Sequence, residues 1–273
     1  MSAYERPARL DDALKFRARV DCSVLAGGTD HFPVRVGRRV EESILDLSAC
    51  RELRGISQTR GGWRIGATTT WTDVLETKLP PLFACLKRAA REVGGAQIQN
   101  AGTIAGNLCN ASPAADGVPA LLALDASVEL ASSVGRRTLP LEEFIRGPRQ
   151  TSLRPDEILA AVLVPRPAYP ARSHFLKLGA RKYLVISIVV VAAAVELEDG
   201  AVRAARVAVG ACSPVARRLP ALEAALLGNR PSGNLVRPEH LAPLAPIDDV
   251  RADAGYRNEA ALVLLQRLLE ALA

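Results

Sequence analysis

The sequence is poor in aromatic residues, and this scarcity argues against one class of function. Phe, Trp and Tyr together make up only 4% of the 273 residues. Proteins that bind single-stranded nucleic acid stack bases on aromatic side chains inside a basic groove. The net charge of +6 comes instead from short and widely separated basic pairs, such as Arg38-Arg39, Arg136-Arg137 and Arg217-Arg218. We therefore expect a solvated basic surface and no nucleic-acid partner.

Cysteines are also few, and none of them lie close together in the sequence. No C-x-x-C pair occurs among Cys22, Cys50, Cys85, Cys109 and Cys212. A disulfide framework or a cysteine-ligated metal cluster requires paired or closely spaced cysteines. The three histidines are equally far apart: His31, His174 and His240. The sequence predicts no disulfide and no metal site, and it favours a reducing cytoplasm.

Long hydrophobic runs are missing as well. The longest apolar run, residues 184–195, is shorter than the roughly 20 residues that cross a bilayer. We predict a buried strand there and no membrane insertion. The first 16 residues contain no apolar segment typical of a secretory signal, so we expect a cytoplasmic protein.

Several short motifs that would assign a chemistry are absent. The sequence contains no G-x-G, no Gly-Lys pair and no G-x-S-x-G. These absences exclude the Rossmann fingerprint, the Walker loop and the hydrolase nucleophile elbow. No convincing triad stands out, so we assign no catalytic residue to this chain.

The pattern that is present predicts a mixed α+β protein with two domains. Helices are expected at residues 8–19, 81–93, 219–227 and 256–273, the first and last of them amphipathic, and a loop at residues 96–116. Asp199-Gly200 lies between two apolar runs and predicts a tight hairpin. Prolines at 165, 167 and 170 suggest a boundary. We predict an N-terminal domain at residues 1–168, with parts at about 1–55 and 56–168, and a C-terminal antiparallel-sheet and helix domain at residues 169–273.

The first stretch that indicates ligand binding is "LAGGTD", residues 25–30, which we call the glycine loop. Gly27 and Gly28 follow a short apolar run, and Thr29 and Asp30 come directly after them. Glycine lets main-chain N–H groups approach a ligand closely, and successive N–H groups in a turn bind anions. A tight turn without any ligand is the alternative that this fragment alone leaves open.

The second such stretch is residues 97–121, which we call the amide-rich segment. It combines amides with small and hydroxyl-bearing residues: Gln97, Gln99, Asn100, Gly102, Thr103, Gly106, Asn107, Asn110, Ser112 and Asp116. Amides and hydroxyls can hydrogen-bond phosphate and ribose oxygens, and small residues leave room for them. Two such segments could hold one extended ligand from two sides, and the diphosphate of FAD is the obvious candidate.

Together, "AGGTDHFP" and "TIAGNLCNASPAAD" resemble the FAD-binding medium subunit, or domain, of the xanthine dehydrogenase and carbon monoxide dehydrogenase family of molybdenum hydroxylases. The resemblance continues through "RGPRQTSLRPDEIL", "HFLKLGARKYLVISIVVVAAAV", "VAVGACSPVARR" and "DVRADAGYRNEAALVLLQRLL", and so covers essentially the whole chain. It implies the two-part FAD-binding fold shared with vanillyl-alcohol oxidase-like enzymes, followed by the C-terminal domain.

The resemblance also implies which residues hold FAD. Residues 26–30 would contact the diphosphate through the main chain, and residues 103–107 would hold it from the other side. Ser112 and Asp116 would bond the ribose or neighbouring flavin groups. Ile158 or Leu159 would pack on the adenine or the ring system, and Lys177 would polarise the flavin edge. The full expected set is Leu25, Ala26, Gly27, Gly28, Thr29, Asp30, Ala101, Gly102, Thr103, Ile104, Gly106, Asn107, Ala111, Ser112, Asp116, Ile158, Leu159 and Lys177.

The resemblance further implies two partner chains, a large subunit with the molybdenum cofactor and a small [2Fe-2S] subunit. Electrons would pass through FAD to a terminal acceptor, either NAD or another molecule. Ala105 replaces a glycine that is more usual in relatives, and no cysteine group for an extra iron–sulfur cluster occurs. A free-standing flavin oxidoreductase and a non-enzymatic nucleotide-binding assembly module remain the alternatives.

Overall fold

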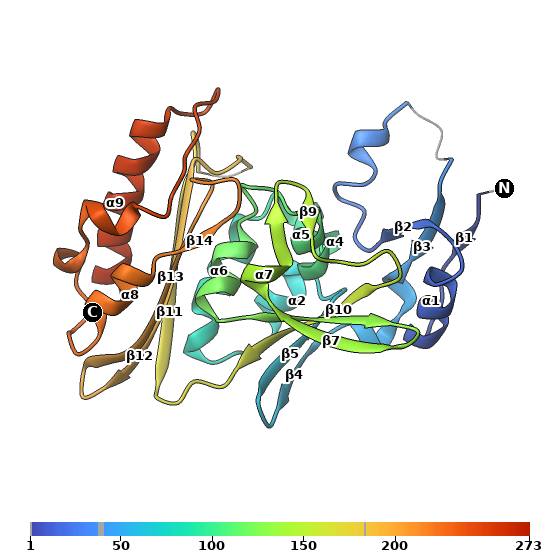
Figure 1. The fold of residues 1–273 in the computed structure, drawn as a ribbon, viewed down its shortest axis with the longest axis horizontal. Coiled ribbons are helices and arrows are strands. Elements are labelled where there is room, and N and C mark those ends of the chain that lie inside the picture. Colours follow the sequence, from blue (N-terminus) through green and yellow to red (C-terminus); the bar gives the residue numbers. More distant parts are fainter. Residues whose placement is uncertain (1, 38–40, 183) are drawn as a thin grey trace.

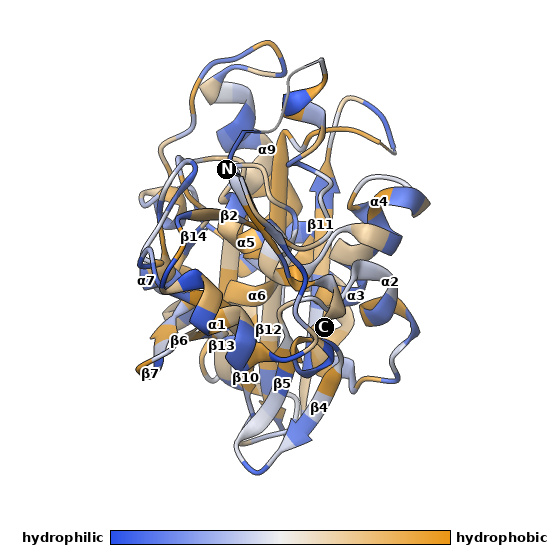
Figure 2. Cartoon of the chain, turned by 90° about the vertical axis from the view of Figure 1, so that its right-hand side faces the viewer, coloured by the Kyte–Doolittle hydropathy of each residue, from blue (hydrophilic) through white to orange (hydrophobic). Residues whose placement is uncertain are grey.

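The computed structural model describes residues 2–37, 41–182 and 184–273, so the basic pair Arg38-Arg39 lies outside the described residues. Three sheets follow one another along the long axis of the molecule (Figure 1). Helices fill the space between the second and third sheets and cover the outer face of the third. In Figure 2, seen from the N-terminal side, hydrophobic residues gather on the central helices and strands.

The N-terminal sheet is small and parallel. Its strands lie in the order β1 (Tyr4–Glu5), β3 (Ser43–Asp46), β2 (Cys22–Leu25). Helix α1 (Leu10–Arg17) lies inside the expected range 8–19 and buries Leu10, Ala13 and Leu14. Three short 3₁₀ helices follow the strands: η1 (Pro33–Arg35), η2 (Leu47–Ala49) and η3 (Arg51–Leu53). Because β2 and β3 are parallel, their carboxyl ends meet at one edge, and the glycine loop leaves the sheet there.

The second sheet is antiparallel, with five strands in the order β4-β5-β10-β6-β7. They span β4 (Ile56–Thr59), β5 (Gly62–Gly66), β10 (Ile158–Pro165), β6 (Ser127–Ser132) and β7 (Gly135–Pro140). A short hairpin, β8 (Ile145–Gly147) with β9 (Gln150–Thr151), lies before β10. The helices of this part are α2 (Trp71–Glu76), η4 (Pro81–Phe83), α3 (Ala84–Glu92), α4 (Ala96–Ala101), α5 (Ile104–Asn110), α6 (Gly117–Ala123) and α7 (Leu141–Phe144).

The expected loop at residues 96–116 is wrong, because α4 and α5 occupy most of it. Thr103 caps α5 by accepting a hydrogen bond from the Gly106 N–H, and Ile104 and Leu108 on one side of the helix are fully buried. A good cap and two buried residues at helical spacing outweigh the low helix propensity of glycine and asparagine.

The third sheet holds β11 (Ala171–Leu178), β12 (Val189–Glu198), β13 (Ala201–Gly210) and β14 (Arg217–Arg218), in that order. The predicted hairpin joins β12 to β13, with positive φ at Asp199 (54°) and Gly200 (79°). The C-terminal elements α8 (Pro220–Leu226), η5 (Gly233–Leu235), η6 (Pro238–Leu241) and α9 (Ala254–Glu270) follow. The strand expected at residues 184–195 begins only at Val189, and Leu184 and Ile186 before it are exposed, in contrast to the expectation.

Strand β12 contributes to two hydrophobic cores at once. Val190, Ala192 and Ala194 belong to the core that includes α3 and α6, whereas the alternate residues, including Val189 and Val191, pack with α8 and α9. Because side chains alternate between the two faces of a strand, a strand covered on both faces is apolar throughout. The domain boundary predicted near residue 168 falls between β10 and β11, and it stays a prediction.

The described residues bear on three features: membrane-spanning helices, disulfide bonds and metal sites. None of the helices in this part of the chain is long and apolar enough to cross a membrane. All five cysteines are free thiols. Residues 2–37, 41–182 and 184–273 contain no cluster of three His, Cys, Asp or Glu side chains that could hold a metal ion.

Arg257 on α9 anchors the end of the chain, although its side chain is fully buried. Its Nη1 donates to the carbonyl oxygens of Ile188 (2.7 Å) and Ala211 (2.9 Å), and its Nη2 contacts Asp249 Oδ1 at 2.7 Å. A buried charge is tolerated when it is paired and hydrogen-bonded in this way.

Replacing Arg257 with methionine leaves two buried carbonyl groups without donors and removes one partner of Asp249. We expect Arg257→Met to lower the free energy of unfolding by about 3 kcal/mol in urea denaturation. Arg203→Met is the matched control, because Arg203 forms an exposed ion pair with Glu198, and its loss costs about 0.5 kcal/mol or less. Equal effects of the two variants would contradict the anchoring role.

Arg137 on β7 makes a second important ion pair, with the buried Glu157. Arg137 Nε and Nη2 contact the two carboxylate oxygens at 2.6 and 2.8 Å, and the Arg154 N–H donates to the same carboxylate. The bonds from Arg137 lower the pKa of Glu157 from its usual value, although burial opposes them. The stabilisation from this ionised group is present above a pH of about 4.3 and is lost as the pH falls through the lowered pKa.

We expect Arg137→Met to move the midpoint of acid unfolding to higher pH, since the bonds from Arg137 that lower the pKa of Glu157 are lost, and only Arg154 still opposes the effect of burial. At pH 7 the same variant should lose about 2 kcal/mol of stability. The control is Arg136→Met, which removes a neighbouring and more exposed arginine bound to Glu129. Circular dichroism followed from pH 6 to pH 2 measures both variants, and identical midpoints would disprove the assignment.

Candidate functional site

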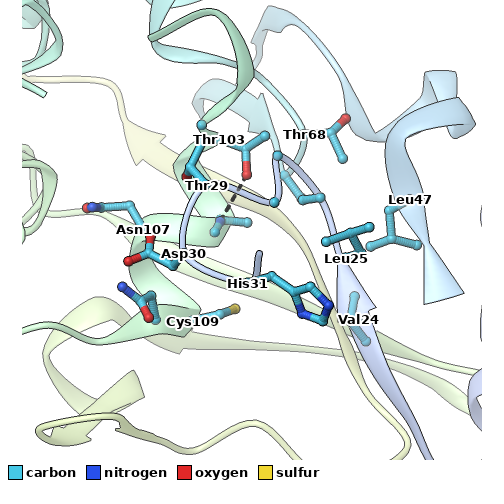
Figure 3. A pocket seen from close by; sticks show the side chains of 18 of the residues that line it. Val24, Leu25, Thr29, Asp30, His31, Leu47, Thr68, Thr103, Asn107 and Cys109 are labelled. Carbon is cyan, nitrogen blue, oxygen red and sulfur yellow. Dashed lines mark hydrogen bonds between the residues drawn. The ribbon is translucent and has the colours of Figure 1, made fainter. Parts of the chain in front are cut away.

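A cavity of about 590 Å³ lies where the N-terminal sheet meets α4, α5 and β10 (Figure 3). Its volume is within the range of small-molecule and cofactor sites. The lining comes from four separate parts of the sequence, namely residues 24–35, 67–71, 93–110 and 149–159, together with Leu47. Sequence segments that are far apart therefore build one site.

The glycine loop forms one wall, and all six of its residues line the cavity. Gly28 has φ of +71°, and a Cβ there would lie 2.6 Å from the Phe32 ring, so only glycine fits. Within the described part of the chain, the main-chain N–H groups of Gly28, Thr29 and Asp30 donate to no protein acceptor. Three successive free N–H groups beside a cavity make an anion-binding nest.

The glycine loop is in direct contact with the amide-rich segment. A Cβ on Gly27 would lie only 1.9 Å from the carbonyl oxygen of Ala101, and 3.0 Å from the Cα of Gly102. The two main chains thus touch, although about 75 residues separate them in sequence. This contact fixes the distance between the two predicted binding segments.

The amide-rich segment contributes side chains rather than N–H groups. The first N–H groups of α5 already have protein acceptors: Thr69 O for Ile104, Ala67 O for Ala105, Thr103 Oγ1 for Gly106 and Thr103 O for Asn107. Thr103 and Asn107 line the cavity with their side chains, and Gly102 and Gly106 keep it open. Of the N–H groups in residues 28–30 and residues 104–107, only those of the glycine loop are therefore available to bind an anion.

Two polar atoms of the cavity-lining residues are buried without a partner. They are Asn107 Oδ1 and His31 Nε2, in the part of the structure that can be described. Buried polar atoms almost always have a partner, so this pair of exceptions indicates a site that is completed by something else. Burial lowers the pKa of His31, and the neighbouring Arg35 guanidinium lowers it further, so its ring is neutral at pH 7.

The opposite end of the cavity is apolar. Val24 and Leu25 on β2 and Leu47 at the start of η2 lie near the His31 ring (Figure 3), and Ile158 and Leu159 at the start of β10 also line the cavity. The cavity therefore has a polar end at Thr29, Asp30 and Asn107 and an apolar end. This division matches a ligand that carries both a charged centre and a flat apolar ring.

Six of the predicted residues do not line the cavity. Ala101 contacts Gly27 from outside it, and Ile104 is fully buried in the core. Ala111 adopts φ of +44° at the end of α5 and accepts a hydrogen bond from the Arg149 N–H. The others are Ser112, Asp116 and Lys177.

Asp116 and Lys177 form a buried ion pair of 2.7 Å. Ser187 donates its hydroxyl to the other carboxylate oxygen of Asp116 at 2.5 Å. Burial raises the pKa of Asp116, while Lys177 and Ser187 oppose that rise by favouring the carboxylate. The two residues that the resemblance places at the flavin thus bind each other.

Sequence reasoning missed several residues of the cavity wall, including Thr68, Cys109, Arg149 and Glu157. Cys109 falls inside the amide-rich segment, next to the predicted amide Asn110, so its position could have indicated it. Arg149 has φ of +60° and donates to the Asn110 carbonyl at 3.2 Å. Arg149 and Glu157 belong to the stretch "RGPRQTSLRPDEIL" that carries the resemblance, but nothing in it distinguishes them from their neighbours, and no local pattern marks Thr68.

Two family models match the chain. The model described as "FAD binding domain in molybdopterin dehydrogenase" matches residues 1–167, and "CO dehydrogenase flavoprotein C-terminal domain" matches residues 174–272. The chain is 35% identical to the putative xanthine dehydrogenase FAD-binding subunit of Escherichia coli K12, over 78% of this chain and 75% of that protein. It is 30% identical to the carbon monoxide dehydrogenase medium chain of Afipia carboxidovorans, over 98% and 95%.

Solved structures agree with the sequence comparisons. A carbon monoxide dehydrogenase chain from Hydrogenophaga pseudoflava superposes with a TM-score of 0.89 at 29% identity, covering 99% of this chain and 96% of that one. A chain of quinoline 2-oxidoreductase from Pseudomonas putida 86 superposes with a TM-score of 0.86 at 27% identity, covering 100% and 96%. The chain therefore belongs to the family of FAD-binding medium subunits of the molybdenum hydroxylases.

Proposed function

We propose that the nest of N–H groups in the glycine loop holds the diphosphate of FAD, and that the rest of the cavity holds the groups on either side of it. The free amides at residues 28–30, beside a cavity that spans a polar and an apolar end, carry this proposal. Bound FAD supplies reversible two-electron chemistry, so the protein needs no acid–base pair of its own.

Each cavity residue has a role that follows from its chemistry. Thr103 and Asn107 face the glycine loop and supply polar side-chain contacts to the cofactor. Ile158 and Leu159 provide a flat apolar surface on which the adenine or the flavin ring packs. Ser112, Asp116 and Lys177 lie outside the cavity in this structure, and we keep their proposed contacts with the ribose or the flavin as part of the same proposal.

We further propose that the chain works in a complex. Relatives include the medium subunit of nicotine 6-hydroxylase and a medium chain of carbon monoxide dehydrogenase, and one similar solved structure is that of a Cu,Mo-CO dehydrogenase. In this complex, a metal centre on another chain would pass electrons to the FAD bound here. A large subunit with the molybdenum cofactor would supply the substrate site, and a small [2Fe-2S] subunit would supply the metal centre. We place this complex in the cytoplasm. The terminal acceptor is NAD or another electron acceptor.

The contact between Gly27 and Ala101 gives the sharpest test of the cofactor site. Gly27→Ala forces a Cβ against the Ala101 carbonyl, and the glycine loop must move away from the amide-rich segment. We expect FAD affinity to fall at least tenfold, which corresponds to about 1.4 kcal/mol. Flavin absorbance of the purified chain and titration with added FAD measure the loss.

The matched control for this experiment is Gly61→Ala. A Cβ at Gly61, in the turn between β4 and β5, meets no atom within 4 Å, so we expect normal FAD binding. Equal FAD affinity in both variants would refute the role of the glycine loop. A wild-type chain that neither contains FAD nor takes it up would refute the proposed function itself.

The proposed complex can be tested by affinity purification of the tagged chain from its own host. We expect molybdenum and iron to co-elute with the chain, in a particle larger than the chain alone. If the chain instead elutes alone, contains FAD and oxidises a small substrate, the alternative of a free-standing flavin oxidoreductase is correct. Metal analysis and size-exclusion chromatography distinguish the two results.

A further inference from the structure

The buried pair of Lys177 and Asp116 belongs to a longer chain of polar groups. Their side chains are only 6% and 9% exposed. Ser187, which is fully buried, donates to the carboxylate oxygen that Lys177 leaves unpaired. The hydroxyl of Ser187 is thus the second partner of Asp116, and it comes from the segment that leads into β12.

Ser187 is itself held by the last part of the chain. Its carbonyl oxygen accepts a hydrogen bond from Arg251 Nη1 at 2.9 Å. Arg251 pairs with Asp249, and Asp249 also contacts the buried Arg257 on α9. A continuous series of ion pairs and hydrogen bonds therefore runs from α9 to the Lys177–Asp116 pair.

This series ends directly behind the wall of the cofactor cavity. Lys177 Nζ also donates to the carbonyl oxygen of Glu92 at 3.3 Å, and the next residue, Val93, lines the cavity. On the other side, a Cβ at Gly117 would lie 2.8 Å from Asn107 Oδ1, and Asn107 lines the cavity too. Lys177 therefore bonds to the residue that precedes Val93 in the wall. Asp116 directly precedes Gly117, which lies near Asn107 in the same wall.

A buried charge acts on its surroundings more strongly than a solvated one, because little water screens it. The Ser187 hydroxyl stabilises the Asp116 carboxylate by hydrogen bonding. Without this bond, the O–H dipole no longer offsets part of the negative charge of Asp116, so the electrostatic potential at the cavity becomes more negative. A reduced flavin carries more negative charge than an oxidised one, so a more negative electrostatic potential at the cavity makes reduction harder.

We propose that Ser187 is a positioning residue for the Lys177–Asp116 pair, and that through this pair the C-terminal sheet and α9 set the reduction potential of the flavin bound in the cavity. The inference rests on the FAD binding proposed above. It gives the C-terminal part of the chain a direct electrostatic role at the site.

The test compares the midpoint potential of bound FAD in the full chain and in Ser187→Ala, by titration against redox dyes. We expect the potential of Ser187→Ala to shift to more negative values. The matched control is Ser173→Ala on β11, because Ser173 is also buried but its hydroxyl bonds only to the main chain of Leu82 and Cys85. If Ser187 had only a structural role, the midpoint potentials of Ser187→Ala and Ser173→Ala would both stay unchanged, or both would shift by the same amount.

A second variant covers the case in which Ser187→Ala fails to fold. Arg251→Met releases the carbonyl of Ser187 and leaves its hydroxyl intact, and we expect a smaller shift in the same direction. An unchanged potential in Ser187→Ala, or in Arg251→Met where only that variant folds, overturns the inference. Absence of FAD from the wild-type chain would instead remove the proposed function, so the two failures are distinguishable.

Discussion

The site depends on one close contact between two main-chain segments, at Gly27 and Ala101. No side chain fits at residue 27, because its Cβ would lie 1.9 Å from the Ala101 carbonyl oxygen. This approach brings the end of a parallel sheet against a group of short helices from another part of the chain. The cavity, the free N–H groups of the glycine loop and the position of Asn107 all depend on it.

The remaining structure holds these two surfaces in place. Ile158 and Leu159 reach the cavity because β10 runs through the middle of the second sheet, and Glu157 before them is fixed by Arg137. Helices α3 and α6 pack on the third sheet, so the wall formed by Val93 and Asn107 is supported from behind. The glycine loop is thus held between regular elements, which is typical of sites that must keep a cofactor in one geometry.

Much of this arrangement could be predicted from the sequence. The glycine loop, the hairpin at Asp199-Gly200, the α+β class and the FAD-binding family follow from short motifs, and the fold and family are confirmed. The helices in the amide-rich segment were missed, because caps and burial outweigh local propensity there. The exposure of Leu184 and Ile186 was missed because an apolar run does not show where its strand begins. Arg149 and Glu157 were not predicted as cavity residues, although they belong to the stretch "RGPRQTSLRPDEIL", because the motif does not show which of its side chains face the ligand.

The two-sided packing of strand β12 limits which insertions and deletions this chain can accept during evolution. Its alternate residues belong to two different cores, so inserting or deleting one residue within it would exchange the two faces. Valines that fill one core would then press into the space now occupied by Ala192 and Ala194 in the other. Single-residue length changes should therefore accumulate in the turns around β12 and be purged from the strand, whereas substitutions of similar size are tolerated.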